Sequence, residues 1–289
     1  MGEVITPTGR KFLPGDLSIA QWTDIETFFQ QLNERGPTSK AELETWLRDW
    51  SELEAAIDEE AAWRYIRMTC DTRDKDAADR YQSFTSTVLP KVEEWKDKLN
   101  RKLTASPYSE ELTGSGYPVF LRGVREQQRI FRDVNVPLQA DLRTLAQEYS
   151  GTIGGMQVDW KGEKLTLPKA GAILESTDRA EREGIYHAIA ARRARDSDKL
   201  DLLFDRMMEK RGTIARNAGF ADYRDYSYSA LGRFDHTPED AFAFHDAIEK
   251  KVVPVVEQLE NERKVNLGVD TLRPWDLAVD PENRAPLRP

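Results

Sequence analysis

Residues 39–57 read SKAELETWLRDWSELEAAI, and this run determines the fold class of the chain. Its apolar residues recur at steps of three and four, which is the spacing of one face of a helix. Ser39 and Glu42 stand at the positions of an N-terminal capping box. We therefore predict a helix that begins after Ser39 and runs toward Met68. Its apolar positions are Trp46, Leu47, Trp50, Leu53, Ile57, Ala61 and Tyr65.

The same spacing continues on both sides of this run. A return helix over residues 74–102, kinked at Pro90, would pair with the first helix as a long antiparallel hairpin. Further helices are expected over residues 17–32, 119–131 and 138–153. A helix from Asp178 would break near Ser197 and stop at Gly219, which suits a helix C-terminus. The last helix would begin at Thr237, bend at Pro254 and carry the apolar stripe Ala241, Phe244, Ile248, Val252, Val255 and Leu259.

One segment follows a period of two residues. Met156, Val158 and Trp160 alternate with polar residues up to the turn Lys161-Gly162, and the alternation resumes after it. This pattern is typical of a β-hairpin. Pro168 and Gly171 separate the hairpin from the next helix. The predicted fold class is therefore mainly α, a multi-helix array with a long N-terminal helical hairpin and one small β-hairpin near residues 156–167.

Composition restricts the function. The 289 residues include 51 acidic and 42 basic side chains, giving a net charge of −9, with three histidines and one cysteine. A single cysteine excludes an intramolecular disulfide framework and a multi-cysteine zinc site. An acidic chain with interspersed charges argues against nucleic acid as a partner. No apolar run is long enough to cross a bilayer, and residues 1–14 lack an apolar signal-peptide core. We expect a soluble cytoplasmic protein without a membrane or nucleic-acid partner.

Few residues could support catalysis. His245 and Glu249 lie four apart on one predicted helix, but a His-Glu-x-x-His zinc motif is absent. A metal site built from His236, His245 and Glu249 stays open as a minor alternative. His187 stands alone, and no base is spaced to activate the Cys70 thiol at a helix end. Neither a Gly-x-Ser-x-Gly elbow nor a phosphate-cradling glycine loop occurs. We therefore predict no catalytic residue and no metal ligand in this chain.

Residues 216–238, RNAGFADYRDYSYSALGRFDHTP, mix aromatic side chains with Arg and Asp, and we interpret them as a loop between helices. Such a loop could present phenol and guanidinium groups to the carbonyl and carboxylate groups of a peptide. Alternatively, its aromatic rings and ion pairs attach the loop to neighbouring helices. Composition alone leaves both interpretations open.

Four motifs carry a resemblance. They are Arg216-Asn-Ala-Gly-Phe220, Tyr223-Arg-Asp-Tyr226, Leu231-Gly-Arg-Phe-Asp-His-Thr-Pro238 and Leu272-Arg-Pro-Trp-Asp276. In order and spacing they closely resemble the oligoendopeptidase F branch of the thimet-oligopeptidase-like zinc metallopeptidases, as does the helix start Asp178-Arg-Ala-Glu-Arg182. The resemblance implies a helical enzyme that admits short peptides to a deep channel. It also implies one zinc ion, bound by His-Glu-x-x-His and a later Glu, in the full-length enzyme.

The chain stops before the place where those enzymes carry their zinc helix. The resemblance therefore implies an N-terminal half that binds no zinc and is inactive alone, with short peptides and the missing C-terminal catalytic half as partners. It suggests a substrate-binding channel wall near Tyr226, Arg233, Asp235 and His236. The implied regions are a helical hairpin or lid at 1–105, a channel wall at 106–276 and a linker at 277–289. The alternative function is a non-enzymatic helical module that binds peptides or a partner protein.

Overall fold

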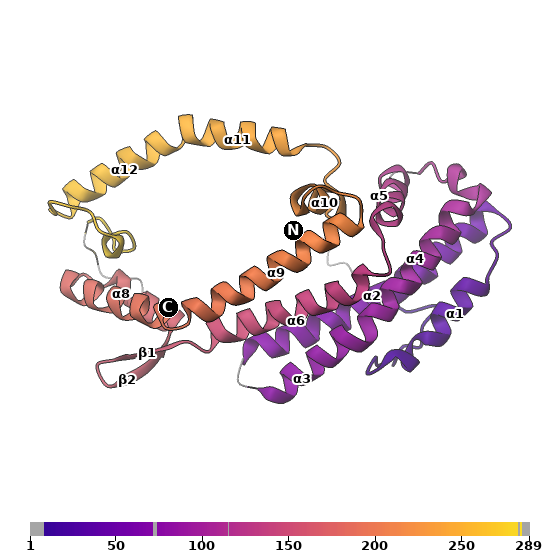
Figure 1. The fold of residues 1–289 in the computed structure, drawn as a ribbon, viewed down its shortest axis with the longest axis horizontal. Coiled ribbons are helices and arrows are strands. Elements are labelled where there is room, and N and C mark those ends of the chain that lie inside the picture. The colour runs from indigo at the N-terminus through magenta and orange to yellow at the C-terminus, as the bar shows by residue number, and fades with distance from the viewer. Residues whose placement is uncertain (1–8, 72–73, 115, 283, 285–289) are drawn as a thin grey trace. The chain divides into compact units, whose positions relative to one another are not determined.

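The computed structural model describes residues 9–71, 74–114, 116–282 and 284. It is mainly helical with one two-stranded antiparallel sheet, so the predicted fold class is confirmed (Figure 1). The chain forms two compact units. The first comprises Met1–Ala146 and Met207–Arg233, and the second comprises Gln147–Arg206 and Phe234–Pro289. The predicted regions 1–105, 106–276 and 277–289 divide the chain by role and stay a prediction.

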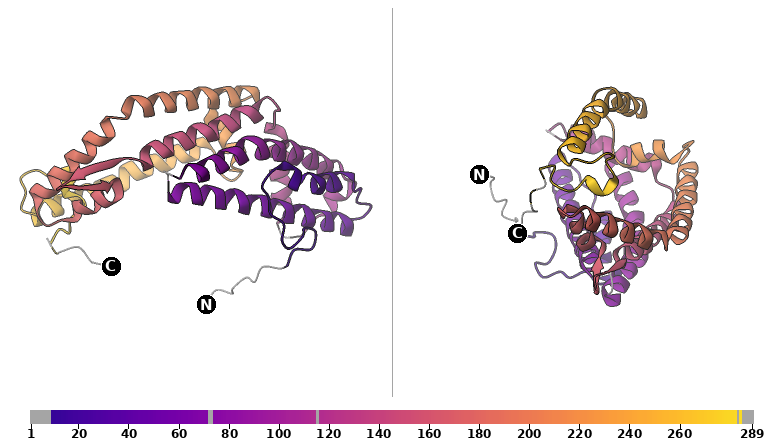
Figure 2. Two further views of the ribbon diagram at one scale, coloured as in Figure 1. Left: turned by 90° about the horizontal axis from the view of Figure 1, so that it is seen from below. Right: turned by 90° about the vertical axis from the view of Figure 1, so that its left-hand side faces the viewer.

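The first unit begins with the predicted helical hairpin. Its first arm is α2 (Lys40–Cys70), and its second arm comprises α3 (Lys75–Ser83), a π-helical turn (Phe84–Val88) and α4 (Leu89–Ala105). The π-helical turn lies just before the predicted kink at Pro90. Both arms run side by side in Figures 1 and 2, and Lys96 of α4 forms an ion pair of 3.2 Å with Glu54 of α2.

The cap of α2 differs from the prediction in one contact. The Glu42 backbone N–H donates to the Ser39 hydroxyl at 3.2 Å, as a capping box requires. The Glu42 carboxylate, however, accepts hydrogen bonds from the backbone N–H and hydroxyl of Thr38, at 2.7 and 2.9 Å, instead of the Ser39 N–H. These bonds to the charged form lower the pKa of Glu42. The helix therefore begins where predicted.

The helix expected over residues 17–32 begins later than predicted. A 3₁₀ turn (Trp22–Asp24) precedes α1 (Glu26–Glu34), and residues 17–21 are not helical. The cause is Asp24, whose carboxylate accepts hydrogen bonds from the backbone N–H groups of Ala20 and Gln21 at 2.8 and 2.9 Å. The core of this part includes Ile25, Phe29, Leu32, Trp46, Leu53, Phe84 and Leu99.

The remainder of the first unit packs around a smaller core. It includes a 3₁₀ turn (Pro107–Glu111), α5 (Tyr117–Ile130), the first half of α6 (Asn135–Gly154), the end of α9 (Ser197–Asn217) and α10 (Tyr223–Ala230). The buried amide of Asn135 donates to the Ile214 carbonyl at 3.0 Å and accepts from Asn217 at 2.8 Å. These bonds fix the start of α6 to the end of α9.

The second unit contains the predicted hairpin, which is confirmed. Strands β1 (Gln157–Trp160) and β2 (Glu163–Thr166) pair with Val158 opposite Leu165. Lys161 and Gly162 form the turn with φ values of 49° and 88°, a left-handed pair that favours glycine. The hairpin packs on α8 (Arg179–Ala194), which begins after Asp178 as predicted.

The interval between hairpin and α8 is not a simple break. It forms the short helix α7 (Leu167–Ala172) and a 3₁₀ turn (Ile173–Glu175). Pro168 lies in the first turn of α7, where its missing N–H costs nothing, so the residue expected to break structure begins a helix instead. Val158, Ala170, Ile185 and Ile189 form the buried core of this part.

The predicted last helix is two helices in near continuity, α11 (Pro238–Lys251) and α12 (Val253–Asn266). Thr237 and Asp240 form the predicted reciprocal capping box. A final 3₁₀ turn (Pro274–Asp276) follows. Within the predicted linker, Val279 is buried and its carbonyl accepts a hydrogen bond from Arg263 at 2.6 Å, while residues 283 and 285–289 lie outside the described residues. No described helix combines the length and apolarity needed to cross a membrane.

Candidate functional site

The segment that we interpreted as a loop contains a helix. Asp222 accepts a hydrogen bond from the Asp225 backbone N–H at 2.9 Å and caps α10, so the prediction of a loop throughout residues 216–238 is wrong. Residues after α10 return to irregular structure up to the cap of α11. The aromatic side chains of the segment are therefore presented partly by a helix and partly by a short connection.

Tyr226 lies on the inner face of α10. It is 6% exposed and packs in the core with Ile130, Ile214, Ala215 and Ala218. Its hydroxyl accepts a hydrogen bond of 3.4 Å from the Gln139 amide, and its ring contacts the rings of Phe220 and Tyr223. Burial raises the pKa of the Tyr226 phenol. Tyr226 is therefore a core residue that positions α10, and its phenol is not exposed to a ligand.

Arg233 is exposed at the end of the first unit. Its backbone N–H donates to the Tyr228 carbonyl at 2.9 Å, and its guanidinium carbon lies 5.0 Å from the centroid of the Tyr228 ring. This cation–π contact holds the guanidinium without using its N–H donors on a carboxylate. Arg233 can therefore offer a forked set of donors to an anionic or carbonyl-bearing ligand.

Asp235 and His236 are exposed in the second unit, directly before the Thr237 cap. Hydrogen bonds from the Thr237 backbone and hydroxyl lower the pKa of Asp240, and the charge of His236 acts in the same direction. The four predicted substrate-binding residues thus occupy one continuous stretch of chain but two units. Tyr226 and Arg233 belong to the first unit, and Asp235 and His236 belong to the second.

The donors do not fit a zinc ion. Nowhere in the described part of the chain do three His, Cys, Asp or Glu side chains gather as a metal site requires. The alternative site of His236, His245 and Glu249 is therefore wrong. The His187 ring instead packs against the ring of Trp275, with centroids 5.3 Å apart, and Cys70 is exposed at the last position of α2.

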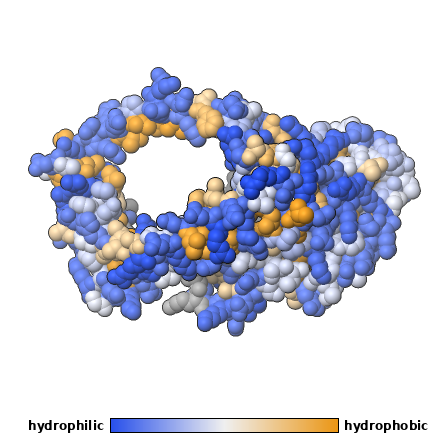
Figure 3. All heavy atoms as spheres, in the orientation of Figure 1, coloured by the Kyte–Doolittle hydropathy of each residue, from blue (hydrophilic) through white to orange (hydrophobic). Residues whose placement is uncertain are grey.

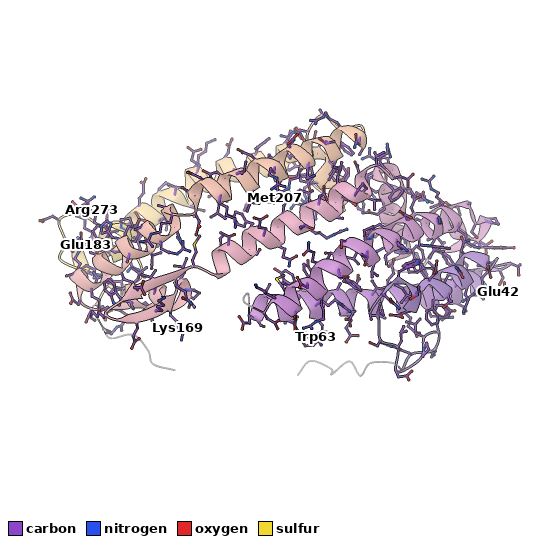
Figure 4. The ribbon with its side chains drawn as sticks, turned by 60° about the horizontal axis from the view of Figure 1, so that its bottom comes forward. Glu42, Trp63, Lys169, Glu183, Met207 and Arg273 are labelled. Atoms are coloured by element: carbon purple, nitrogen blue, oxygen red, sulfur yellow. The ribbon has the colours of Figure 1, made fainter. Side chains whose placement is uncertain are left out.

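A buried charged cluster was not predicted from the sequence. The Asp276 carboxylate is completely buried and accepts hydrogen bonds from two arginines of α8. Arg179 donates from Nε at 3.0 Å and from Nη2 at 2.8 Å, and Arg182, which is 2% exposed, donates from Nη2 at 2.9 Å. The Arg273 backbone N–H adds a bond of 3.0 Å. Figure 4 labels Arg273 near Glu183 of α8, the helix that carries Arg179 and Arg182.

Electrostatics keep this cluster ionised. Burial alone would raise the pKa of Asp276, but the hydrogen bonds from Arg179 and Arg182 outweigh it and lower the pKa to about 2. Arg182 also donates to the carbonyls of Trp275 and Ser176, at 3.0 and 2.8 Å. Both oxygens of Asp276 and the buried guanidinium of Arg182 are thus used within the fold, so the cluster fastens residues 273–276 to α8. The Arg179 side chain stays 43% exposed.

Comparison with known protein families identifies the family of the chain. Residues 15–131 match the peptidase M3 N-terminal domain, and residues 172–285 match peptidase family M3. The chain belongs to the M3 peptidase family. Peptidases of this family depend on zinc, although the described residues of this M3 chain hold no group fit to bind it. No curated protein sequence matches the chain.

Solved structures share the fold. PZ peptidase A, determined with an inhibitor, matches with a TM-score of 0.86 at 24% identity, covering 93% of this chain and 48% of the other. A structure described as an oligoendopeptidase F from Bacillus anthracis matches with a TM-score of 0.83 at 21% identity, covering 89% of this chain and 47% of the other. The oligoendopeptidase-F of Enterococcus faecium matches with a TM-score of 0.69 at 15% identity, covering 90% and 55%. This M3 chain therefore spans about half the length of these relatives.

Proposed function

We propose that this chain is the N-terminal portion of a zinc-dependent metalloendopeptidase that hydrolyses short peptides. The observation that carries the proposal is the coverage: two successive M3 profiles match most of the chain, while the chain spans only 48% of PZ peptidase A. The zinc ligands and the catalytic base would belong to a further portion with a His-Glu-x-x-His motif. This portion and the peptide substrate are the proposed partners.

The role of this chain would be to bind and position the peptide. The Arg233 guanidinium lies over the Tyr228 ring. Its N–H groups are suited to donate hydrogen bonds to a peptide carboxylate or carbonyl. The exposed Asp235 carboxylate and the His236 imidazole could receive a peptide N–H or amine. Tyr226 would support this wall from the core. An acidic chain with a single cysteine suits a reducing compartment, and we propose a cytoplasmic location.

An activity assay tests this function. The purified chain with zinc and a quenched fluorescent peptide is expected to show no turnover. Addition of the polypeptide encoded directly downstream is expected to produce turnover that a chelator abolishes. Chelator-sensitive turnover by this chain alone, or no turnover by the combination, would contradict the proposal.

The peptide-binding role has a separate test in the active combination. Arg233→Ala is expected to raise KM at least fivefold with little change in kcat, because it removes ground-state contacts outside the reacting groups. Arg195→Ala, at an exposed position after α8, is the matched control. Equal KM values for the two variants would remove Arg233 from the binding wall while leaving the family assignment intact.

The runner-up function is a non-enzymatic helical module that binds peptides or a partner protein. It is favoured by one observation, the large exposed apolar side chains of α11 and α12. A downstream reading frame without His-Glu-x-x-His would favour the module over the enzyme portion.

A further inference from the structure

The helices α11 and α12 bury nothing in the described part of the chain. Neither helix contains a buried residue. Large apolar side chains on them are nevertheless 42–76% exposed, namely Phe242, Phe244, Val252, Val253, Val255, Val256, Leu259 and Val265. Figure 3 shows hydrophobic residues gathered along this helix pair. A helix of this length is marginally stable in water unless an apolar face is covered.

Four of these side chains, those of Phe244, Val252, Val255 and Leu259, fall in one stripe with the partly buried Ala241 and Ile248. The Val252 N–H donates to the Ile248 carbonyl at 2.8 Å and the Val256 N–H donates to the Val252 carbonyl at 3.0 Å, so helical bonding continues across the junction near Pro254. The helical phase of α11 therefore carries into α12. On a common helix, residues 241, 244, 248, 252, 255 and 259 fall within a sector of about 80°, from the rotation of about 100° per residue. We call this set the α11–α12 stripe.

The stripe has the character of a contact surface. Apolar residues on a helix face at this spacing normally face a core or a partner. A contiguous apolar patch of this kind marks an interaction site in a folded protein. The side chains on either side of it, such as Glu249, Lys251 and Glu260, are charged and exposed, which is the arrangement of an apolar centre with a polar rim.

Two observations indicate the occupant. The stripe lies in residues 172–285, which match peptidase family M3 itself, outside residues 15–131, which match the N-terminal domain. The solved relatives are about twice as long as the matched region, with 48% and 47% of their chains covered. The relatives therefore contain a further portion that this chain does not span, and that portion is the candidate to cover the helix pair.

We propose that the α11–α12 stripe is the docking surface for the metal-binding portion of the M3 peptidase. This inference rests on the proposed function, because it names the partner of the same enzyme. It goes further in assigning the contact to one apolar face. Val255 and Leu259 are neighbouring exposed members of the stripe on α12, with 53% and 58% of their surface accessible, and should contribute to binding.

The test is a binding measurement with the intact 289-residue chain. The probe is the polypeptide encoded directly downstream, and its Kd is measured for the wild-type chain and for the double variant Val255→Glu/Leu259→Glu. We expect the double variant to bind at least tenfold more weakly. Val119→Glu is the matched control, since Val119 is 67% exposed on α5 in the first unit. Circular dichroism would establish that all variants keep the helix content of the wild type.

Each other outcome overturns the inference in a distinguishable way. Equal Kd values for the wild type and the double variant would refute the docking surface but leave the proposed function standing. A downstream polypeptide without His-Glu-x-x-His would refute the proposed function as well. If sedimentation shows a wild-type dimer that the double variant converts to a monomer, a second copy of this chain covers the stripe and the inference is wrong.

Discussion

Replacement of Asp276 by Asn should loosen the second unit at the start of α8. The substitution keeps the size of the side chain but removes its charge. Arg182, which is 2% exposed, then stays buried without a carboxylate partner. Removal of one partner from a buried ion pair costs about 3–5 kcal/mol, because the remaining charge is left uncompensated.

The pKa of Asp276 gives a second measure of the same interaction. The shift from 3.8 to about 2 corresponds to about 2.5 kcal/mol at neutral pH, since one pKa unit is worth ~1.4 kcal/mol. The pKa figure is slightly below the range for a broken buried pair, and together they bracket a loss of about 3 kcal/mol for the Asn variant. The carboxylate has a lowered pKa in the folded state. Its contribution is therefore complete above pH 4 and is lost as the pH falls from about 4 to 2.

Native-state hydrogen exchange measures this loss locally. The opening free energy of α8 amides should fall by about 3 kcal/mol in Asp276→Asn at pH 7, and the difference from wild type should shrink at pH 3. Asp280→Asn is the control, because its carboxylate pairs with Arg284 at the surface. The reasoning is refuted if both variants exchange alike at pH 7, or if the difference between wild type and Asp276→Asn is independent of pH.

Three further substitutions probe other parts of the fold. Trp46→Phe removes the buried indole N–H that donates to the Leu32 carbonyl at 2.8 Å, and urea unfolding should show a loss of about 1–3 kcal/mol. Gly184→Ala places a Cβ 2.8 Å from the Trp160 ring, and overpacking should cost about 1–3 kcal/mol in the same measurement. The Glu52 carboxylate accepts hydrogen bonds of 2.8–3.3 Å from the backbone N–H groups of residues 11–13. Glu52→Gln weakens these bonds, so proteolytic cleavage of the loop at residues 11–13 should accelerate several-fold.

Each of these predictions has a matched control. Trp63→Phe changes an exposed tryptophan of the same helix, Gly171→Ala adds a Cβ that meets nothing within 4 Å, and Glu59→Gln alters an exposed carboxylate of α2. A variant that behaves as its control does would show that the contact named for it contributes nothing measurable.

The local rules that the sequence obeys account for much of the fold. Ser39, Asp178 and Thr237 each begin a helix by accepting a backbone N–H, which is a contact between residues two or three apart. The turn at Lys161-Gly162 depends on its own two φ values. Such elements were predictable because their causes lie within a few residues of chain.

Helix α10 was missed for the opposite reason. Its sequence, YRDYSYSA, is rich in Tyr and Ser, which are indifferent helix formers. What stabilises it is tertiary packing, the burial of Tyr226 against the end of α9 and against Ile130 of α5, which is 96 residues away in the sequence. The Asp276 cluster was missed likewise, because its partners are 94 and 97 residues away and no spacing rule connects them.

These contacts also separate the residues of the candidate site by physical role. The motifs at 178–182 and 272–276, which entered the resemblance independently, meet in one buried ion cluster, so packing explains their residue types. The burial of Tyr226 is explained in the same way. Arg233 and Asp235 differ, because both are exposed and neither contributes to a described core. The proposed contact with peptide therefore depends on Arg233 and Asp235 more than on Tyr226. Arg233→Ala should raise KM by a larger factor than Tyr226→Phe does.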